Sequence, residues 1–341
     1  MKSKKPRIAL VVDVDNWAFA NIARQVIKNL GHKYDFQYIV MDGIDNIIKV
    51  LFLVEDCDVV HFFWRGQLLW LNDYPTHDYL QKLGFCETDE YIKELMPNLN
   101  ISTAVYDHLF LDNKASQTKE VLKYVKNYYV CSKRLNKIYS NLEGIKRPKA
   151  VVTDGVDLKK FFPKNLKRFD TISTRKIVIG WAGNSKWTSD IEDFKGVHTI
   201  LKPALEELKR EGYGIEEYFA DRVIRMIPHD KMNDYYSKID VYICPSKIEG
   251  TPNPVLESMA CGVPVISTDV GIVPDVFGKK QKKMILEERS KECLKEKLVY
   301  LFENKGLFKE LSEENLNSIK GWSWVEKCKD FDRYFVKCLR K

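Results

Sequence analysis

Residues 244–264 read CPSKIEGTPNPVLESMACGVP and indicate the organisation of the chain more clearly than any other stretch. Two glutamates, Glu249 and Glu257, stand eight positions apart (257 − 249 = 8) and bracket a segment rich in Gly, Pro, Thr and Asn. The apolar run VYICPS that leads into them is typical of a strand, and VLESMA is typical of a short helix. The next apolar run, PVIST, follows at once, so strand, loop, helix and strand succeed one another as in a parallel α/β sheet.

The start of the predicted helix is suited to an anion. We expect Pro252 or Pro254 in its first turn and Thr251 or Asn253 as its cap. A helix N-terminus behind a Gly-containing loop presents unpaired amides and a positive dipole end, which favour a phosphate. The two carboxylates would not stabilise a phosphate and are better suited to accept hydrogen bonds from hydroxyls. A nucleotide sugar supplies both groups, whereas a purely helix-capping Glu257 is the structural alternative.

The same alternation of strand and helix runs along the whole chain of 341 residues. It breaks in a polar stretch after Asp154-Gly155 and starts afresh with KIVIGWAG at 176–183. We therefore predict an α/β fold of two Rossmann-like doubly wound domains. The predicted parts are an N-terminal domain (1–155), a C-terminal domain (156–325) and a C-terminal helix (326–341) that returns to the first domain. Residues 66–99 are predicted to form a partly helical insertion.

Composition limits the class of protein. The chain is 45% hydrophobic and 30% charged, as in an ordinary globular protein, and has no apolar run long enough for a membrane span. The apolar run Ile8–Val12 is too short for a signal peptide, so we expect a cytoplasmic protein. Its eight cysteines form no C-x-x-C pair, which indicates free thiols in a reducing compartment rather than a zinc site.

The net charge of +7 is unevenly distributed, since lysines and arginines are dense between residues 114 and 149. This cluster has two interpretations: a solvated helix face, or attraction to an anionic membrane surface or a phosphorylated substrate. In the second case the protein would lie peripherally on the inner face of a membrane. We expect no nucleic-acid partner, because no binding motif accompanies the basic residues.

Residues 235–276, YYSKIDVYICPSKIEGTPNPVLESMACGVPVISTDVGIVPDV, closely resemble the donor-binding signature of family 4 retaining glycosyltransferases, which have the GT-B fold. The resemblance extends to VTDGVDLKKFFP at the domain junction and to IVIGWAGNSKW and DFKGVHTILKPALEEL, and looks like whole-chain membership. It implies that the two domains face a cleft, with residues 1–155 as the acceptor-binding domain and residues 156–325 as the nucleotide-sugar-binding domain. It also implies that Glu257 holds the ribose of a nucleotide sugar and that Glu249 contacts the donor sugar. The backbone near the diphosphate and sugar would then be that of Gly250, Thr251, Pro252 and Asn253.

The family also places a basic pair, an Arg and a Lys, on the diphosphate. Lys195 before Gly196 fits the lysine, but the positions expected for the arginine hold Ser189 and Asp190. We propose Lys186 in place of the missing arginine; the alternative is that Lys186 is a solvated surface lysine. The same loop, which follows a strand, is expected to bring Gly183 and Asn184 to the donor. A cation is required there because the leaving diphosphate gains negative charge in the transition state.

The first domain matches the family pattern less well. Members often carry a His just before an Asp at a strand end, whereas here Tyr106 precedes Asp107 and His108 follows it. We expect His108 near the sugar, with a buried structural His as the alternative, and place Asp107 on the acceptor side. Arg65 is predicted to meet an acceptor phosphate, and His61 to be structural.

The loop after the first strand carries further acceptor candidates. Asp13-Val14-Asp15 spells a D-x-D motif, but directly after a strand we expect Asp15 or Asn16 to cap the next helix rather than to bind a metal. Many relatives have a Gly-rich loop here, and this chain instead brings Trp17 to the strand end. Asp15, Asn16 and Trp17 are therefore predicted to bind the acceptor.

The resemblance implies a retaining transfer from a nucleotide diphosphate sugar, with UDP expected and GDP open, to a hydroxyl of a glycan or lipid-linked acceptor. His108, Lys195 and Glu249 would be the catalytic residues, and neither a metal nor a cofactor is expected. A sugar-nucleotide epimerase or a phosphorylase would share the GT-B fold, and the phosphorylase is disfavoured because no lysine context resembles a pyridoxal-phosphate site. The alternative is a catalytically silent subunit that binds and stabilises a partner enzyme, which the missing arginine and the shifted histidine favour.

Overall fold

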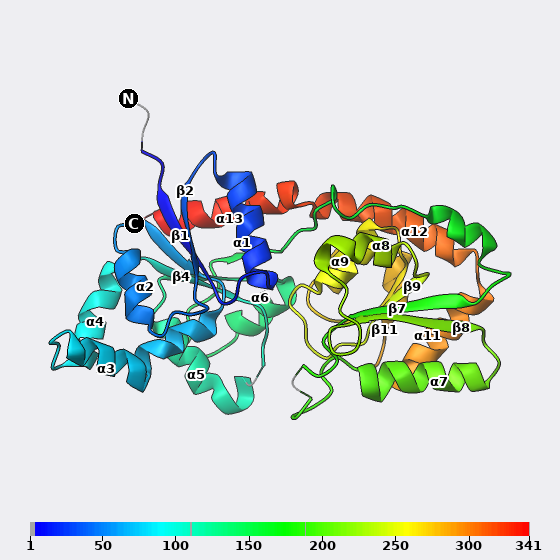
Figure 1. Cartoon of the computed structure of the whole chain (residues 1–341), viewed down its shortest axis with the longest axis horizontal. Helices are drawn as coiled ribbons and strands as arrows, with labels where there is room; N and C mark the ends of the chain where they lie inside the picture. The colour runs from blue at the N-terminus through cyan, green and yellow to red at the C-terminus, as the bar shows by residue number, and fades with distance from the viewer. Residues whose placement is uncertain (1–3, 110, 188, 341) are drawn as a thin grey trace. The chain divides into compact units, whose positions relative to one another are not determined.

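The computed structural model describes residues 4–109, 111–187 and 189–340, and of residues 112–116 the backbone only. The chain separates into two compact units (Figure 1). Unit 1 comprises Met1–Asp154 and Trp324–Lys341, and unit 2 comprises Gly155–Ser323.

Unit 1 is a parallel sheet with helices on both faces. Its strand order is β2-β1-β3-β4-β5-β6, and every recorded pairing is parallel. The strands are β1 (Arg7–Val12), β2 (Asp35–Val40), β3 (Val59–Phe62), β4 (Ile101–Val105), β5 (Asn127–Val130) and β6 (Ala150–Val151). The helices are α1 (Ala18–Leu30), α2 (Ile47–Leu53), η1 (Arg65–Asn72), α3 (Tyr74–Lys82), α4 (Thr88–Asn98), α5 (Leu111–Lys123), α6 (Lys133–Ser140) and α13 (Trp324–Leu339). The predicted insertion is thus η1, α3 and α4.

The last helix of the chain completes unit 1. α13 lies beside α1 on one face of the sheet, where Phe331, Tyr334 and Phe335 are fully buried (Figure 1). Tyr334 Oη lies 2.8 Å from Ser102 Oγ of β4, and Tyr34 Oη donates to Asp332 Oδ1 at 2.8 Å. Buried apolar area and these hydrogen bonds together attach α13 to the unit.

Unit 2 repeats the same topology. Its sheet has the order β11-β10-β9-β7-β8, again parallel throughout, so both units place their second strand at an edge beside their first. The strands are β7 (Ile177–Gly183), β8 (Ile215–Asp221), β9 (Val241–Cys244), β10 (Val265–Thr268) and β11 (Ile285–Leu286). The helices are η2 (Leu166–Thr171), η3 (Val197–Leu201), α7 (Lys202–Arg210), η4 (His229–Lys231), α8 (Met232–Tyr236), α9 (Asn253–Ala260), α10 (Val273–Val276), η5 (Gln281–Met284), α11 (Lys291–Glu303), α12 (Leu307–Ser318) and η6 (Ile319–Trp322).

This strand order fixes where a ligand site is expected in each unit. Connections leave the sheet in opposite directions at β1/β3 in unit 1 and at β7/β9 in unit 2. Ligands of doubly wound sheets bind at such switch points, outside the carboxyl ends of the strands. The prediction of two Rossmann-like α/β domains is confirmed. Strand β11 was not predicted, since two residues are too few to give a periodic pattern.

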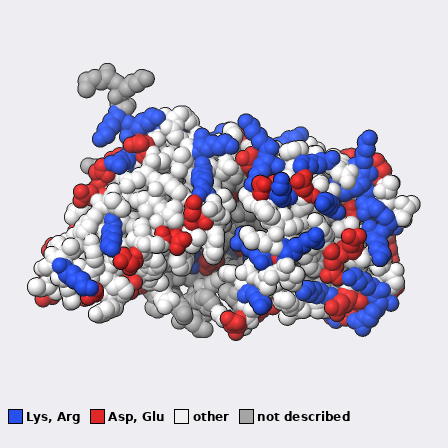
Figure 2. All heavy atoms as spheres, in the orientation of Figure 1, with Lys and Arg blue, Asp and Glu red and all other residues white. Residues whose placement is uncertain are grey.

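In the described ranges, no helix combines the length and the apolar character needed to cross a bilayer. On the face drawn in Figure 2, basic and acidic side chains are interspersed over both units. The excess of positive charge therefore does not form one large patch on that face.

Candidate functional site

The loop from Pro245 to Pro252 connects β9 to α9 at the switch point of unit 2. The predicted cap was wrong: Pro252 occupies the N-cap position, no side chain caps the helix, and Asn253 is already its first residue. The Thr251 hydroxyl is buried without a recorded partner, so it does not reach the helix amides. The first turn of α9 therefore keeps amides that a ligand can use.

Two glycines allow close packing against this loop. Gly271 has φ of +49°, and a Cβ there would lie 2.0 Å from the carbonyl oxygen of Gly250. Gly196 has φ of +68°, and a Cβ there would lie 2.4 Å from the carbonyl oxygen of Pro245. Only glycine fits both the backbone angle and the space, so the two glycines determine the path of the loop that carries Glu249.

Two of the predicted catalytic residues form an ion pair. Lys195 Nζ lies 2.6 Å from Glu249 Oε1, and the two side chains are 21% and 18% exposed. The ammonium also lies 5.0 Å from the centre of the Trp187 ring. Burial lowers the pKa of Lys195, but the Glu249 carboxylate more than offsets this effect, so the pKa lies above its ordinary value. A charged lysine is thus held in a partly buried site.

Glu257 is held through both of its carboxylate oxygens. Tyr236 Oη donates to Oε2 at 2.8 Å, and His229 Nε2 lies 3.3 Å from Oε1. Lys160 Nζ lies 2.7 Å from His229 Nδ1. Since an ammonium only donates, Nδ1 must accept, which leaves the proton on Nε2 to donate to Glu257. This network fixes the carboxylate while leaving other lone pairs free for a ligand.

Sequence reasoning missed Lys160, His229 and Tyr236. They lie 97, 28 and 21 positions before Glu257 in the sequence (257 − 160, 257 − 229, 257 − 236), so no local spacing connects them. Tyr236 belongs to the segment that resembles the family signature, but nothing in its type or position indicated a contact with Glu257.

The other predicted donor residues surround the end of β7. Gly183 ends the strand, and Asn184 follows it. Asn184 Oδ1 accepts from the amide of Lys186 at 3.0 Å, while the side chain of Lys186 is exposed. Ser185 N donates to Asp221 Oδ1 at 3.2 Å, which fixes this loop to the end of β8. The β7 loop and the β9 loop thus lie at the same switch point of the sheet.

Arg65 and Asp107, both predicted acceptor residues, bind each other in unit 1. Arg65 Nη2 and Nη1 donate to the Asp107 carboxylate at 2.8 and 3.3 Å, and Asp107 Oδ1 also accepts from Leu109 N at 3.0 Å. The pair lines a cavity of about 280 Å³ outside the carboxyl ends of β3 and β4. His108 is partly buried directly after Asp107.

The β1 loop differs from the prediction. Trp17 stands at the N-cap of α1, without a side-chain cap, so neither Asp15 nor Asn16 caps the helix. The reason is that the Asp15 carboxylate instead pairs with Arg24 and accepts from Tyr38 Oη at 2.8 Å. Asn16 has φ of +64°, and Trp17 is 54% exposed. The loop thus presents an aromatic ring at the carboxyl end of β1.

Residues 194–317 match the family model described as glycosyl transferases group 1. The matched region lies within unit 2 and contains Lys195, Glu249 and Glu257. Unit 2 therefore carries a glycosyltransferase group 1 domain.

The curated relatives come from bacteria, an archaeon and plants, and several of them are named glycosyltransferases or mannosyltransferases. The putative teichuronic acid biosynthesis glycosyltransferase TuaC of Bacillus subtilis is 39% identical over 74 residues, which cover 22% of this chain and 19% of the relative. The lipopolysaccharide core biosynthesis mannosyltransferase LpsB of Rhizobium meliloti is 42% identical over 146 residues, 36% of this chain and 41% of the relative. The chain thus spans less than half the length of either relative.

Solved structures extend the likeness to the whole chain. A glycosyltransferase from Rickettsia africae has a TM-score of 0.69 at 15% identity and covers 99% of each chain. Anabaena HepE, solved with UDP, has a TM-score of 0.65 at 10% identity, covering 97% of this chain and 100% of the other. The catalytic domain of Arabidopsis thaliana starch synthase IV, solved with ADP and acarbose, has a TM-score of 0.70 at 10% identity, with 99% and 100% covered. The predicted GT-B fold is confirmed.

Proposed function

We propose that the protein is a family 4 retaining glycosyltransferase that transfers a sugar, with hexoses expected, from a UDP-sugar to an acceptor hydroxyl. The observation that carries this proposal is the partly buried ion pair between Lys195, just before η3, and Glu249, on the loop that leads into the uncapped start of α9. The group 1 domain and the UDP and ADP bound to two structural neighbours support a nucleotide diphosphate donor.

Each residue of the donor site has a role that follows from its chemistry. Lys195 would neutralise the diphosphate, because negative charge grows on the leaving group during transfer. An ammonium has three N–H donors, so the bond to Glu249 leaves two for phosphate oxygens. Glu249 would accept from a hydroxyl of the donor sugar, and Glu257 from the ribose.

Retention would follow from attack on the face that the diphosphate leaves. The bond between the anomeric carbon and the phosphate oxygen breaks, the bond to the acceptor oxygen forms on the same face, and the acceptor proton passes to the leaving phosphate. This route requires no carboxylate nucleophile, no metal and no cofactor. His108, at the end of β4, would contact the sugar.

The acceptor side is proposed on unit 1. Asp15, Asn16, Trp17, Arg65 and Asp107 all follow the carboxyl ends of its strands, where a ligand is expected. We propose a glycan or lipid-linked acceptor in polysaccharide or glycoconjugate biosynthesis, which agrees with the names of the relatives TuaC and LpsB.

We also propose that the protein works in the cytoplasm, at the inner face of a membrane, because its lysines and arginines are dense between residues 114 and 149. Sedimentation with vesicles that contain anionic lipid should recover the protein at low salt and release it at high salt. Failure to sediment at low salt would contradict this part of the proposal.

The activity is tested with a panel of UDP-, GDP- and ADP-sugars in the absence of an acceptor. Slow hydrolysis of one donor, lost in Lys195→Ala, is expected, and the anomeric configuration of the first sugar released, followed by NMR, would report on retention. The missing arginine at Ser189 and Asp190 favours the alternative of a silent, partner-stabilising subunit. That alternative predicts no hydrolysis of any donor.

A further inference from the structure

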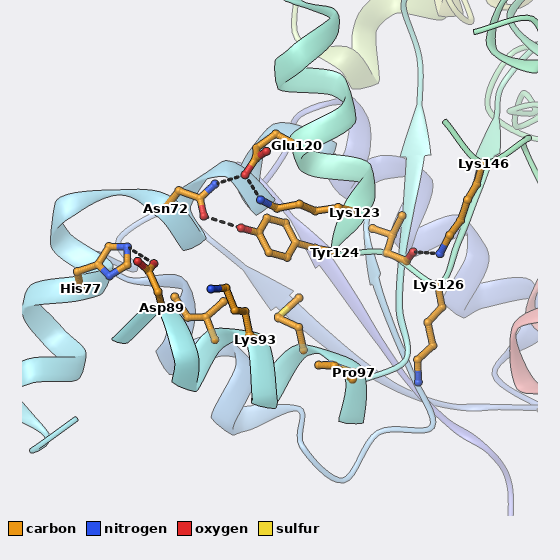
Figure 3. Close-up of a pocket in the computed structure, with 13 residues that line it drawn as sticks. Asn72, His77, Asp89, Lys93, Pro97, Glu120, Lys123, Tyr124, Lys126 and Lys146 are labelled. Atoms are coloured by element: carbon orange, nitrogen blue, oxygen red, sulfur yellow. Dashed lines mark hydrogen bonds and ion pairs between the residues drawn. The ribbon is translucent and has the colours of Figure 1, made fainter. Parts of the chain in front are cut away.

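Unit 1 contains a cavity of about 910 Å³ between α4 and the C-terminal part of α5 (Figure 3). This volume is at the upper end of the range for ligand sites. Pro97 and Lys126, which line it, lie shortly before the first residues of β4 and β5, and Lys126 N donates to Ile101 O at 2.8 Å. The cavity therefore lies toward the amino ends of the parallel strands, whereas Arg65 and Asp107 follow the carboxyl ends. It is separate from the proposed acceptor residues.

One part of the cavity carries groups that suit sugar hydroxyls. Asn72 accepts a hydrogen bond from Tyr124 Oη and donates to Glu120 Oε1 at 3.1 Å. Lys123 pairs with Glu120, and its ammonium lies 4.8 Å from the centre of the Tyr124 ring. Figure 3 shows these four side chains grouped together. An amide, a carboxylate and a phenol offer both donors and acceptors for paired hydroxyls, and an aromatic face suits the C–H face of a sugar.

The same cavity carries more positive than negative charge, since four lysines and two carboxylates, Asp89 and Glu120, line it. In the part of the chain that the structure describes, Lys93 and Lys126 have no recorded ion-pair partner. Lys146 Nζ donates to the neutral carbonyl of Val125 at 3.4 Å. Lys123 already neutralises Glu120. The other carboxylate of the lining, Asp89, lies 3.9 Å from His77 Nε2. The three remaining lysines therefore exceed the one remaining carboxylate and leave net positive charge for the acidic groups of a ligand.

The apolar side chains of the lining do not form a channel for a lipid tail. Ile92, Met96 and Val125 are only 4%, 7% and 2% exposed, so they close the floor of the cavity rather than open an apolar path. The accessible lining mixes apolar carbon surface with the polar and charged groups named above, so it suits a ligand that offers hydroxyls and acidic groups as well as C–H faces, which an acyl or isoprenoid chain does not.

We propose that this cavity binds an acidic oligosaccharide segment. Its hydroxyls would lie against Asn72, Glu120 and Tyr124, and its carboxylates near Lys93 and Lys126. The proposal concerns binding alone and does not depend on the identity of the donor.

The test is calorimetric titration of the full chain with trigalacturonic acid at low salt, with saturating UDP present to occupy the proposed donor site. Neutral maltotriose and inorganic pyrophosphate are the comparison ligands. We expect trigalacturonic acid to bind more tightly than either, because it alone offers both hydroxyls and carboxylates. The double variant Lys93→Gln/Lys126→Gln should weaken its binding about tenfold or more.

Lys137→Gln/Lys149→Gln is the matched control, because it removes the same charge from exposed lysines of unit 1 outside the cavity. It should change the affinity less than twofold. Tyr124→Phe should weaken the binding of trigalacturonic acid but not that of pyrophosphate. The proposal would be overturned if trigalacturonic acid did not bind, or if maltotriose or pyrophosphate bound with equal affinity. It would also be overturned if both double variants lost the same affinity for trigalacturonic acid. A separate titration with UDP alone shows whether the proposed donor site binds UDP. A failure of the donor site can thus be distinguished from a failure of the cavity to bind trigalacturonic acid.

Discussion

Single side chains account for the chemistry that we propose in unit 2. Lys195, Glu249 and Glu257 were predicted from the sequence because their residue types and spacing match a known signature. Their partners were not, since Lys160 and Tyr236 reach Glu257 or its neighbour His229 only through the fold. The sequence therefore indicates the groups that we propose to meet a ligand, and the structure adds the side chains that contact them.

Lys195 is expected to act mainly in the transition state. Lys195→Ala should lower kcat about 10²- to 10³-fold, because the leaving diphosphate loses a fixed positive charge. Steady-state kinetics with the best donor measures this. Lys247→Ala is the control, since Lys247 is exposed and pairs with Glu192 at 2.6 Å. Similar effects of the two substitutions would contradict the assignment.

His229 is expected to position Glu257 rather than to touch the reacting atoms. His229→Ala should weaken UDP binding about threefold to tenfold, because Glu257 loses one hydrogen bond. The 2′,3′-dideoxy analogue of UDP lacks the ribose hydroxyls, so its affinity should change little. An equal loss of affinity for both nucleotides would show that His229 does not act through the contact of Glu257 with the ribose hydroxyls.

Loops and strands determine whether these side chains meet. Gly271→Ala should displace the β9 loop, because the new Cβ would lie 2.0 Å from the Gly250 carbonyl oxygen. We expect loss of UDP binding while the thermal unfolding of unit 1 stays unchanged. Gly306→Ala is a suitable control, since a Cβ there meets nothing within 4 Å. Normal UDP binding by Gly271→Ala would contradict the role given to this glycine.

Strand β3 makes the stability of unit 1 sensitive to acid. His61 is fully buried, its Nδ1 lies 2.7 Å from Ser102 Oγ, and burial lowers its pKa to about 3. The unfolded chain binds a proton as the pH falls through about 6.5, whereas the folded chain does not until about 3. This difference should lower the free energy of unfolding by about 1.4 kcal/mol for each pH unit between 6 and 4.

Denaturant unfolding at several pH values measures this dependence. His61→Asn should remove that part of the slope, and His32→Asn, which changes an exposed histidine of the same unit, should keep it. An unchanged slope in His61→Asn would contradict the account.

At the scale of whole elements, the sequence predicted most strands because buried parallel strands are continuous apolar runs. Helix starts were predicted less well. Asp15 has the right type for a cap, but Arg24 and Tyr38 bind its carboxylate in the folded chain. Thr251 is likewise buried away from α9. The first error arises because tertiary partners compete with the local capping bond, and the second because the Thr251 hydroxyl is buried where it does not reach the helix amides.

The whole molecule combines two units of the same topology, and this was predictable because the alternation of strand and helix begins again after a polar stretch. The site of unit 2 was more predictable than that of unit 1, since its two glutamates, Glu249 and Glu257, lie within one strand–loop–helix segment. In unit 1 the corresponding residues come from separate loops, and the pairing of Arg65 with Asp107 bridges 42 positions of sequence. A periodic pattern carries no information about such contacts.

The central claim is that unit 2 holds a nucleotide diphosphate through the segment that contains Glu249 and Glu257. Calorimetric titration of the purified chain with UDP, GDP and ADP without metal, repeated on Glu257→Ala, tests it most directly. The account predicts micromolar binding of UDP that is lost in the variant, because Glu257 would hold the ribose. Failure of all three nucleotides to bind, or equal binding by Glu257→Ala, would contradict it.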